Sequence, residues 1–132
     1  MTLQNDPPRL LIVEDSQELG NILRKALSHL DIDIIHELNG ANALATFQKW
    51  QPDIVLLDIE LPDTTGWRLL DTLRNVATAE HNPAIVVITA LSDAVNRVTG
   101  KIQSVQGYLI KPFSIDQVRQ LVTSLISQRA EL

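Results

Sequence analysis

The sequence contains no cysteine, and its basic residues form no cluster or stripe. Without cysteine the chain can form neither a disulfide nor a zinc–sulfur site, and it cannot use a thiolate nucleophile. Its formal net charge is −5, and no basic surface is present to neutralise phosphates. Direct binding of nucleic acid by this domain is therefore disfavoured.

Long apolar runs are also missing. No run approaches the ~20 apolar residues that a membrane-spanning helix needs. The first nine residues, MTLQNDPPR, lack the apolar core of a signal peptide. We therefore expect no membrane association and a cytoplasmic location.

The length and composition suit one globular domain. The chain has 132 residues, of which 45% are hydrophobic and 20% charged, so a full core can form and wholesale disorder is disfavoured. Residues 1–8 are polar and contain two prolines, which predicts a flexible N-terminal arm. We expect the domain to span residues 9–128, followed by a short tail at 129–132.

Four short apolar runs each stop at polar residues. Runs of this kind, rich in Val, Ile and Leu, are typical of strands buried on both faces of a parallel sheet. The carboxyl edge of such a sheet is where ligands bind. The runs and the residues that follow them are Leu10–Val13 with Glu14-Asp15, Ile54–Leu57 with Asp58, Ala84–Ile88 with Thr89, and Tyr108–Ile110 with Lys111-Pro112.

Strand and helix signals alternate along the whole chain, which predicts an α/β fold with five parallel strands and five helices. Right-handed crossovers then favour a doubly wound, flavodoxin-like sheet with strand order 2-1-3-4-5. The expected strands are Arg9–Val13, Ile32–Glu37, Asp53–Leu57, Ala84–Ile88 and Gln106–Ile110. The expected helices follow Ser16, span Ala41–Trp50 and Trp67–Ala77, and follow Asp93 and Ser114.

In that strand order the first and third strands are neighbours, so Glu14, Asp15 and Asp58 should lie within a few ångströms of one another. Like charges at one place repel and raise one another's pKa unless a cation intervenes. Mg²⁺ suits such a set of oxygen ligands. A carboxylate beside Mg²⁺ can attack a phosphoryl group, and Lys111 and Thr89 would supply a positive charge and a hydroxyl for the phosphoryl oxygens.

With these motifs the chain resembles a response-regulator receiver domain of two-component signalling. Each motif is weak alone, but together they occur in the family's order and at its separations, from about residue 9 to residue 128. The matching pieces are Glu14-Asp15, Asp58 with Leu61-Pro62 and Gly66, Thr89-Ala90, and Lys111-Pro112-Phe113.

The resemblance implies a role for each carboxylate. Asp58 would be the phosphoacceptor, which forms an acyl phosphate from the phosphohistidine of a histidine kinase. Asp15, Asp58 and the backbone carbonyl of Glu60 would ligate Mg²⁺ directly. Glu14 would act mainly through a metal-bound water.

The resemblance also implies a switch. Lys111 would pair with the phosphoryl group, and its bond to Pro112 would be cis. On activation Thr89 would move toward the phosphoryl oxygen, and Tyr108 would turn inward behind it. The donor would be a sensor histidine kinase or a phosphotransfer protein, and the target a downstream partner or an output domain. A homodimer through the switch surface stays open.

Two other functions fit parts of the sequence. A small magnesium-dependent phosphohydrolase would use Asp58 as a turnover nucleophile, but Glu60 stands where such enzymes usually carry a second aspartate. A flavodoxin-like cofactor binder is disfavoured, because the acidic loop after the first strand would repel a phosphate. We therefore expect self-phosphorylation and self-dephosphorylation rather than turnover of a substrate. The three histidines share no ligand spacing, and we interpret His29, His36 and His81 as structural.

Overall fold

The structure, a computed structural model, describes residues 6–90 and 105–130. The helix expected after Asp93 lies outside these residues. No helix within them is long and apolar enough to cross a membrane. The strands are β1 (Arg9–Val13), β2 (Asp33–Glu37), β3 (Ile54–Asp58), β4 (Ala84–Ala90) and β5 (Gly107–Lys111), and the helices are α1 (Gln17–Ala26), α2 (Gly40–Trp50), α3 (Gly66–Val76) and α5 (Ile115–Ala130).

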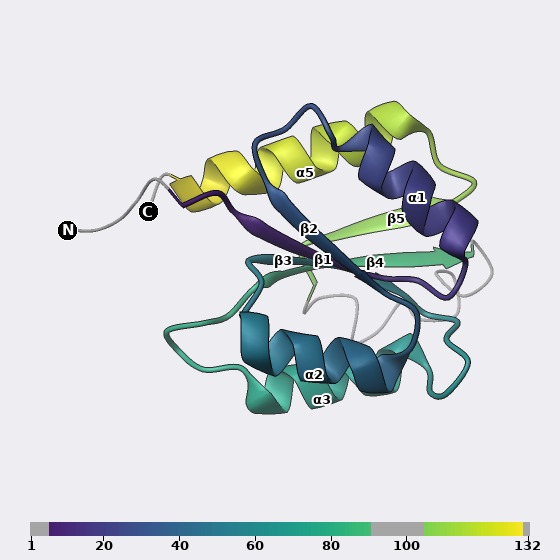
Figure 1. Ribbon diagram of the computed structural model, residues 1–132, viewed down its shortest axis with the longest axis vertical. Coiled ribbons are helices and arrows are strands. Elements are labelled where there is room, and N and C mark those ends of the chain that lie inside the picture. The colour runs from purple at the N-terminus through teal and green to yellow at the C-terminus, as the bar shows by residue number, and fades with distance from the viewer. Residues whose placement is uncertain (1–5, 91–104, 131–132) are drawn as a thin grey trace.

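The five strands form one parallel sheet with the order β2-β1-β3-β4-β5. Helices α1 and α5 cover one face of this sheet, and α2 and α3 cover the other (Figure 1). The predicted doubly wound fold and its strand order are therefore confirmed. Because β1 and β3 are adjacent, the residues that follow them meet at the switch point of the topology.

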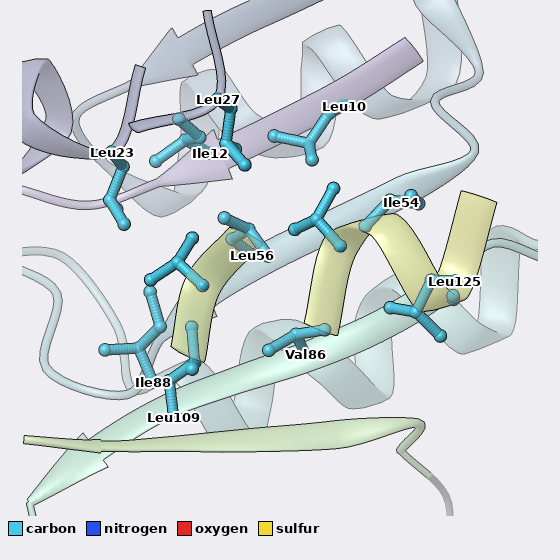
Figure 2. Packing of buried hydrophobic residues seen from close by; sticks show 13 residues of the cluster. Leu10, Ile12, Leu23, Leu27, Ile54, Leu56, Val86, Ile88, Leu109 and Leu125 are labelled. Carbon is cyan, nitrogen blue, oxygen red and sulfur yellow. The ribbon is translucent and has the colours of Figure 1, made fainter. Parts of the chain in front are cut away.

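The strands supply both halves of the core, because successive side chains of a strand point to opposite faces. Leu10 and Ile12 of β1 face α1 and α5, whereas Leu11 and Val13 face α2 and α3. Burial on both faces explains why the central strands are almost continuously apolar. Figure 2 shows the cluster toward α1 and α5, which includes Leu10, Ile12, Leu23, Leu27, Ile54, Leu56, Val86, Ile88, Leu109 and Leu125.

Three strands run further than the sequence predicted. We expected them to stop before Asp58, Thr89 and Lys111, but each of these residues belongs to its strand. Asp58 pairs with Ile88, and Thr89 pairs with Ile110. A backbone ladder does not depend on side-chain polarity, so the apolar run ends earlier than the strand. The polar side chains are consequently held by the rigid sheet rather than by loops.

Polar side chains cap the helices that follow the first three strands. Ser16 accepts a hydrogen bond from the backbone of Leu19, as the sequence predicted. Asn39, which we expected in a turn, is the N-cap of α2, so that helix begins one residue earlier than predicted. Thr65 caps α3 in the same way.

At the edge of the sheet where the strands begin, one carboxylate contacts both the first strand and the last helix. Asp53, just before β3, accepts a hydrogen bond from the backbone nitrogen of Arg9 at 2.9 Å. Its other oxygen lies 3.9 Å from the guanidinium of Arg129 in α5. The first strand and the last helix therefore meet at one side chain.

Candidate functional site

Asp58, the last residue of the central strand β3, has a buried carboxylate that is only 2% exposed. Its Oδ2 accepts a hydrogen bond from the Lys111 ammonium at 2.8 Å. Its Oδ1 accepts one from the backbone nitrogen of Glu60 at 2.7 Å. A buried charge is tolerated only when it is paired and hydrogen-bonded, and both conditions are met here.

Glu14, directly after β1, is the second buried carboxyl group of the site. One of its oxygens accepts a hydrogen bond from the backbone of Ser16 at 3.0 Å. The other, Oε1, is buried with no partner among the described residues. Burial is the main cause that raises the pKa of Glu14 to about 8. The neighbouring Asp58 adds to the rise, and Lys111 opposes it. Without a cation, Glu14 is therefore largely protonated at neutral pH.

This shift predicts how stability depends on pH. We expect the free energy of unfolding of the metal-free protein to fall as the pH rises from about 4.5 to about 8. In that window the folded state keeps the Glu14 proton that the unfolded chain has lost, so higher pH favours unfolding. Near pH 8, Glu14→Gln should be more stable than the parent by at least the ~1.4 kcal/mol of one pKa unit.

Urea titrations of both proteins with a chelator, near pH 4 and near pH 8, measure this difference. Near pH 4 the folded and unfolded parent both carry the proton, so the advantage of the glutamine variant over the parent should be smallest there. The same difference in unfolding free energy at both pH values would contradict the assignment of the raised pKa to Glu14.

Lys111 ends β5 and brings a positive charge to the two carboxyl groups. Burial by itself would lower the pKa of Lys111, but the hydrogen bond to Asp58 and the charges of Asp58, Glu14 and Glu60 raise it overall. The lysine therefore stays an ammonium in this setting. The peptide bond between Lys111 and Pro112 is cis, which is the geometry that the sequence resemblance implies.

The three carboxylates expected at the site differ in burial. Glu14 is buried near Asp58, whereas Asp15 is exposed. Among residues 6–90 and 105–130 no three acidic or histidine side chains are grouped as a ready-made metal cluster. Mg²⁺, however, is usually held by one or two carboxylates and keeps several waters. The buried Oε1 of Glu14, which has no partner among the described residues, fits such a site.

Thr89 and Tyr108 lie on the neighbouring strands β4 and β5. Thr89 is 2% exposed, and its hydroxyl donates to the carbonyl of Ala90 at 3.2 Å. Tyr108 packs against the core cluster under α2 and α3, and its hydroxyl is buried without a partner in the described part of the chain. Burial raises the pKa of this phenol.

The family model of the response regulator receiver domain matches residues 10–123 of the chain. The chain belongs to this family. It is a receiver domain of the two-component type, and its fold and strand-end residues agree with that assignment.

Similar proteins place the receiver domain in different larger contexts. It is 33% identical over 128 residues to the transcriptional regulatory protein TrcR of Mycobacterium tuberculosis, covering 96% of this chain and 48% of that protein. It is 36% identical over 126 residues to the sensor histidine kinase TmoS of Ectopseudomonas mendocina, covering 96% of this chain and 13% of that protein. The chain thus spans about half the length of most of these curated relatives.

A solved structure agrees with the fold. The receiver domain (CheY-like) from Methylobacillus flagellatus matches with a TM-score of 0.78 and 26% identity, covering 91% of this chain and 99% of that chain.

Asp63 of the receiver domain has a structural role that the sequence analysis missed. Its two carboxylate oxygens accept hydrogen bonds from the backbone nitrogens of Gly40 and Ala41, at 2.8 and 2.9 Å. Both hydrogen bonds lower the pKa of Asp63, and the one from Gly40 has the larger effect. The loop after Asp58 is thereby tied to the first turn of α2. The sequence offered only an acidic residue in a loop as a signal for this role. That Asp63 bonds to the start of a particular helix can be seen only in the three-dimensional arrangement.

Proposed function

We propose that Asp58 is the phosphoacceptor of this receiver domain. The observation that carries the proposal is its buried carboxylate, held by Lys111 on one oxygen and by the Glu60 backbone on the other. An Asp58 oxygen attacks the phosphorus of a phosphohistidine, forming a P–O bond as the P–N bond breaks. The electron pair of the broken bond returns to the imidazole of the donor. The donor is a sensor histidine kinase or a phosphotransfer protein.

Mg²⁺ is the cofactor that we propose for this site. The carboxylates of Asp15 and Asp58 and the backbone carbonyl of Glu60 would hold it, with Glu14 acting through a bound water. When bound, the ion neutralises charge on the phosphoryl oxygens. The buried Glu14 oxygen that lacks a partner supports this choice, because a hydrated cation would satisfy it.

Lys111 and Thr89 serve the phosphoryl group in this proposal. The Lys111 ammonium already bonds to Asp58, so it stands next to the oxygens that the phosphoryl group would bring. Charge-assisted hydrogen bonds of this kind are stronger than neutral ones. The Thr89 hydroxyl now bonds to the Ala90 carbonyl at 3.2 Å, a long bond that a phosphoryl oxygen can replace.

Tyr108 gives a test of the switch, because it is the single tyrosine of the chain. We expect the ring signals of carbon-13-labelled tyrosine to shift when a beryllofluoride mimic of the phosphoryl group binds. Thr89→Ala should remove most of this shift, because Thr89 connects the phosphoryl group to the neighbouring strand. A tyrosine signal that does not respond to the mimic in the parent would show that no relay reaches Tyr108.

Phosphorylation would control a downstream partner or an output domain. Formation of a homodimer is one way in which this control can act. The competing function is a phosphohydrolase with Asp58 as turnover nucleophile. The experiment is incubation with acetyl phosphate, followed by intact-mass measurement and by assay of released phosphate. A receiver accumulates molecules that carry one phosphoryl group and releases phosphate only as fast as this group hydrolyses, whereas a hydrolase accumulates little phosphorylated protein and releases phosphate rapidly over many turnovers.

A further inference from the structure

His36 of β2 reaches the acidic loop that follows β1. Its Nε2 lies 2.8 Å from the backbone carbonyl oxygen of Glu14. A carbonyl oxygen can only accept a hydrogen bond, so Nε2 carries the hydrogen and donates it. The side chain of a neighbouring strand therefore bonds to the backbone of a residue at the proposed Mg²⁺ site.

This bond replaces a backbone hydrogen bond that the parallel sheet lacks at this position. The Glu14 nitrogen donates to the Glu37 carbonyl at 3.0 Å, which continues the parallel ladder by one step. In such a ladder the Glu14 carbonyl would next accept from the backbone of Asn39. Strand β2 ends at Glu37, however, and Asn39 turns away to cap α2. The His36 imidazole supplies the donor that the backbone no longer provides.

Gly20 of α1 makes room for this ring. A Cβ atom built at Gly20 would lie 1.9 Å from Cε1 of His36, far inside van der Waals contact. Glycine is a poor residue for the middle of a helix, so its presence calls for a packing reason. Gly20 and His36 are therefore complementary: the imidazole fills the space that a side chain of the helix would otherwise occupy.

We propose that His36 is a positioning residue for Mg²⁺ binding, acting through the Glu14–Asp15 peptide. A peptide group is planar, so holding the Glu14 carbonyl fixes the plane that leads into Asp15. Asp15 is exposed, and within residues 6–90 and 105–130 its carboxylate has no hydrogen bond that would hold it in one direction. The direction of its backbone thus decides where the proposed metal ligand points. This inference rests on the proposed function, because it assumes that Asp15 binds Mg²⁺.

The test is the Mg²⁺ dissociation constant, measured by isothermal titration calorimetry on folded protein without any phosphoryl donor. His36→Phe keeps a ring beside Gly20 but removes the donor, and we expect binding about tenfold weaker, as is typical when a partner of a metal ligand is lost. His36→Gln keeps an N–H donor and should regain most of the affinity. Equal affinity in the parent and His36→Phe would overturn the proposal.

His81→Ala is the matched control. His81 also contacts a backbone carbonyl, that of Pro52, but at the opposite edge of the sheet. Its loss should lower stability and leave Mg²⁺ affinity unchanged, so a decrease as large as that of His36→Phe would overturn the proposal. A parent protein that binds no Mg²⁺ would instead reject the proposed function itself.

Gly20→Ala tests the same ring from the helix side. In the parent the new methyl group must displace the imidazole, so Mg²⁺ binding should weaken as it does in His36→Ala. In a His36→Ala background the methyl group meets no ring, and the second substitution should cost no further affinity. Equal losses from Gly20→Ala in both backgrounds would show that the glycine does not act through His36.

Discussion

Asp58→Asn should abolish phosphorylation of the protein by acetyl phosphate. The amide has nearly the shape of the carboxylate but lacks its nucleophilic charged oxygen, so the fold survives while the reacting group is lost. In an intact-mass measurement the parent gains one phosphoryl group with Mg²⁺ present, and the variant gains none. A chelator should prevent labelling of the parent, because no cation then neutralises the charge at the site.

The matched control is Asp33→Asn, which changes an exposed aspartate at the start of β2, away from the site. This variant should be phosphorylated as fast as the parent. Labelling that persists in Asp58→Asn would mean that another side chain is the acceptor.

Gly66→Ala should both destabilise the protein and stop phosphorylation. A Cβ atom at Gly66 would lie 2.5 Å from the backbone oxygen of Asp58 and 2.6 Å from Cα of Ile59. Both neighbours are backbone atoms, at the last residue of β3 and the residue after it, and cannot rotate away, so helix α3 or Asp58 must shift. Overpacking of this kind costs about 1–3 kcal/mol. Urea unfolding measures the loss of stability, and acetyl phosphate labelling measures the displacement of Asp58.

Gly107→Ala provides the comparison. The three atoms nearest to its Cβ atom would be side-chain atoms of Leu121, two of them at 3.0 Å, and a leucine side chain can rearrange. We therefore expect a smaller loss of stability and normal labelling. Two glycine variants with the same unfolding free energy would show that backbone proximity at Gly66 is not the cause.

The fold could be predicted because its signals are local. The apolar runs mark the buried parallel strands, and Ser16 caps the first helix as predicted, whereas the caps Asn39 and Thr65 were interpreted as turn and loop residues. The strand ends were less predictable, since Asp58 and Lys111 continue the backbone ladder although the apolar run has stopped. Side-chain polarity shows where an apolar run ends, and only the structure shows how far the strand pairing continues.

The site could be predicted in its residue types but not in its geometry. Strand order alone brings Glu14 and Asp58 together, as expected. Strand order does not show that Asp15 is exposed or that Glu14 is buried enough to hold its proton. The contact of His36 with the Glu14 carbonyl was equally hidden, because its ring occupies the space left by the absence of a side chain at Gly20, sixteen positions away in the sequence.

The meeting of β1 and α5 at Asp53 has a consequence for how the domain combines with other sequences. Arg9 at the start of β1 and Arg129 near the end of α5 contact the same carboxylate. Figure 1 shows that these ends of β1 and α5 lie close together. A fold whose ends are neighbours tolerates insertion into a host polypeptide and circular permutation, since a short connection can join them. The same domain can therefore be fused at either end or inserted between two host segments. The proposed phosphorylation site lies at the opposite edge of the sheet, away from such connections.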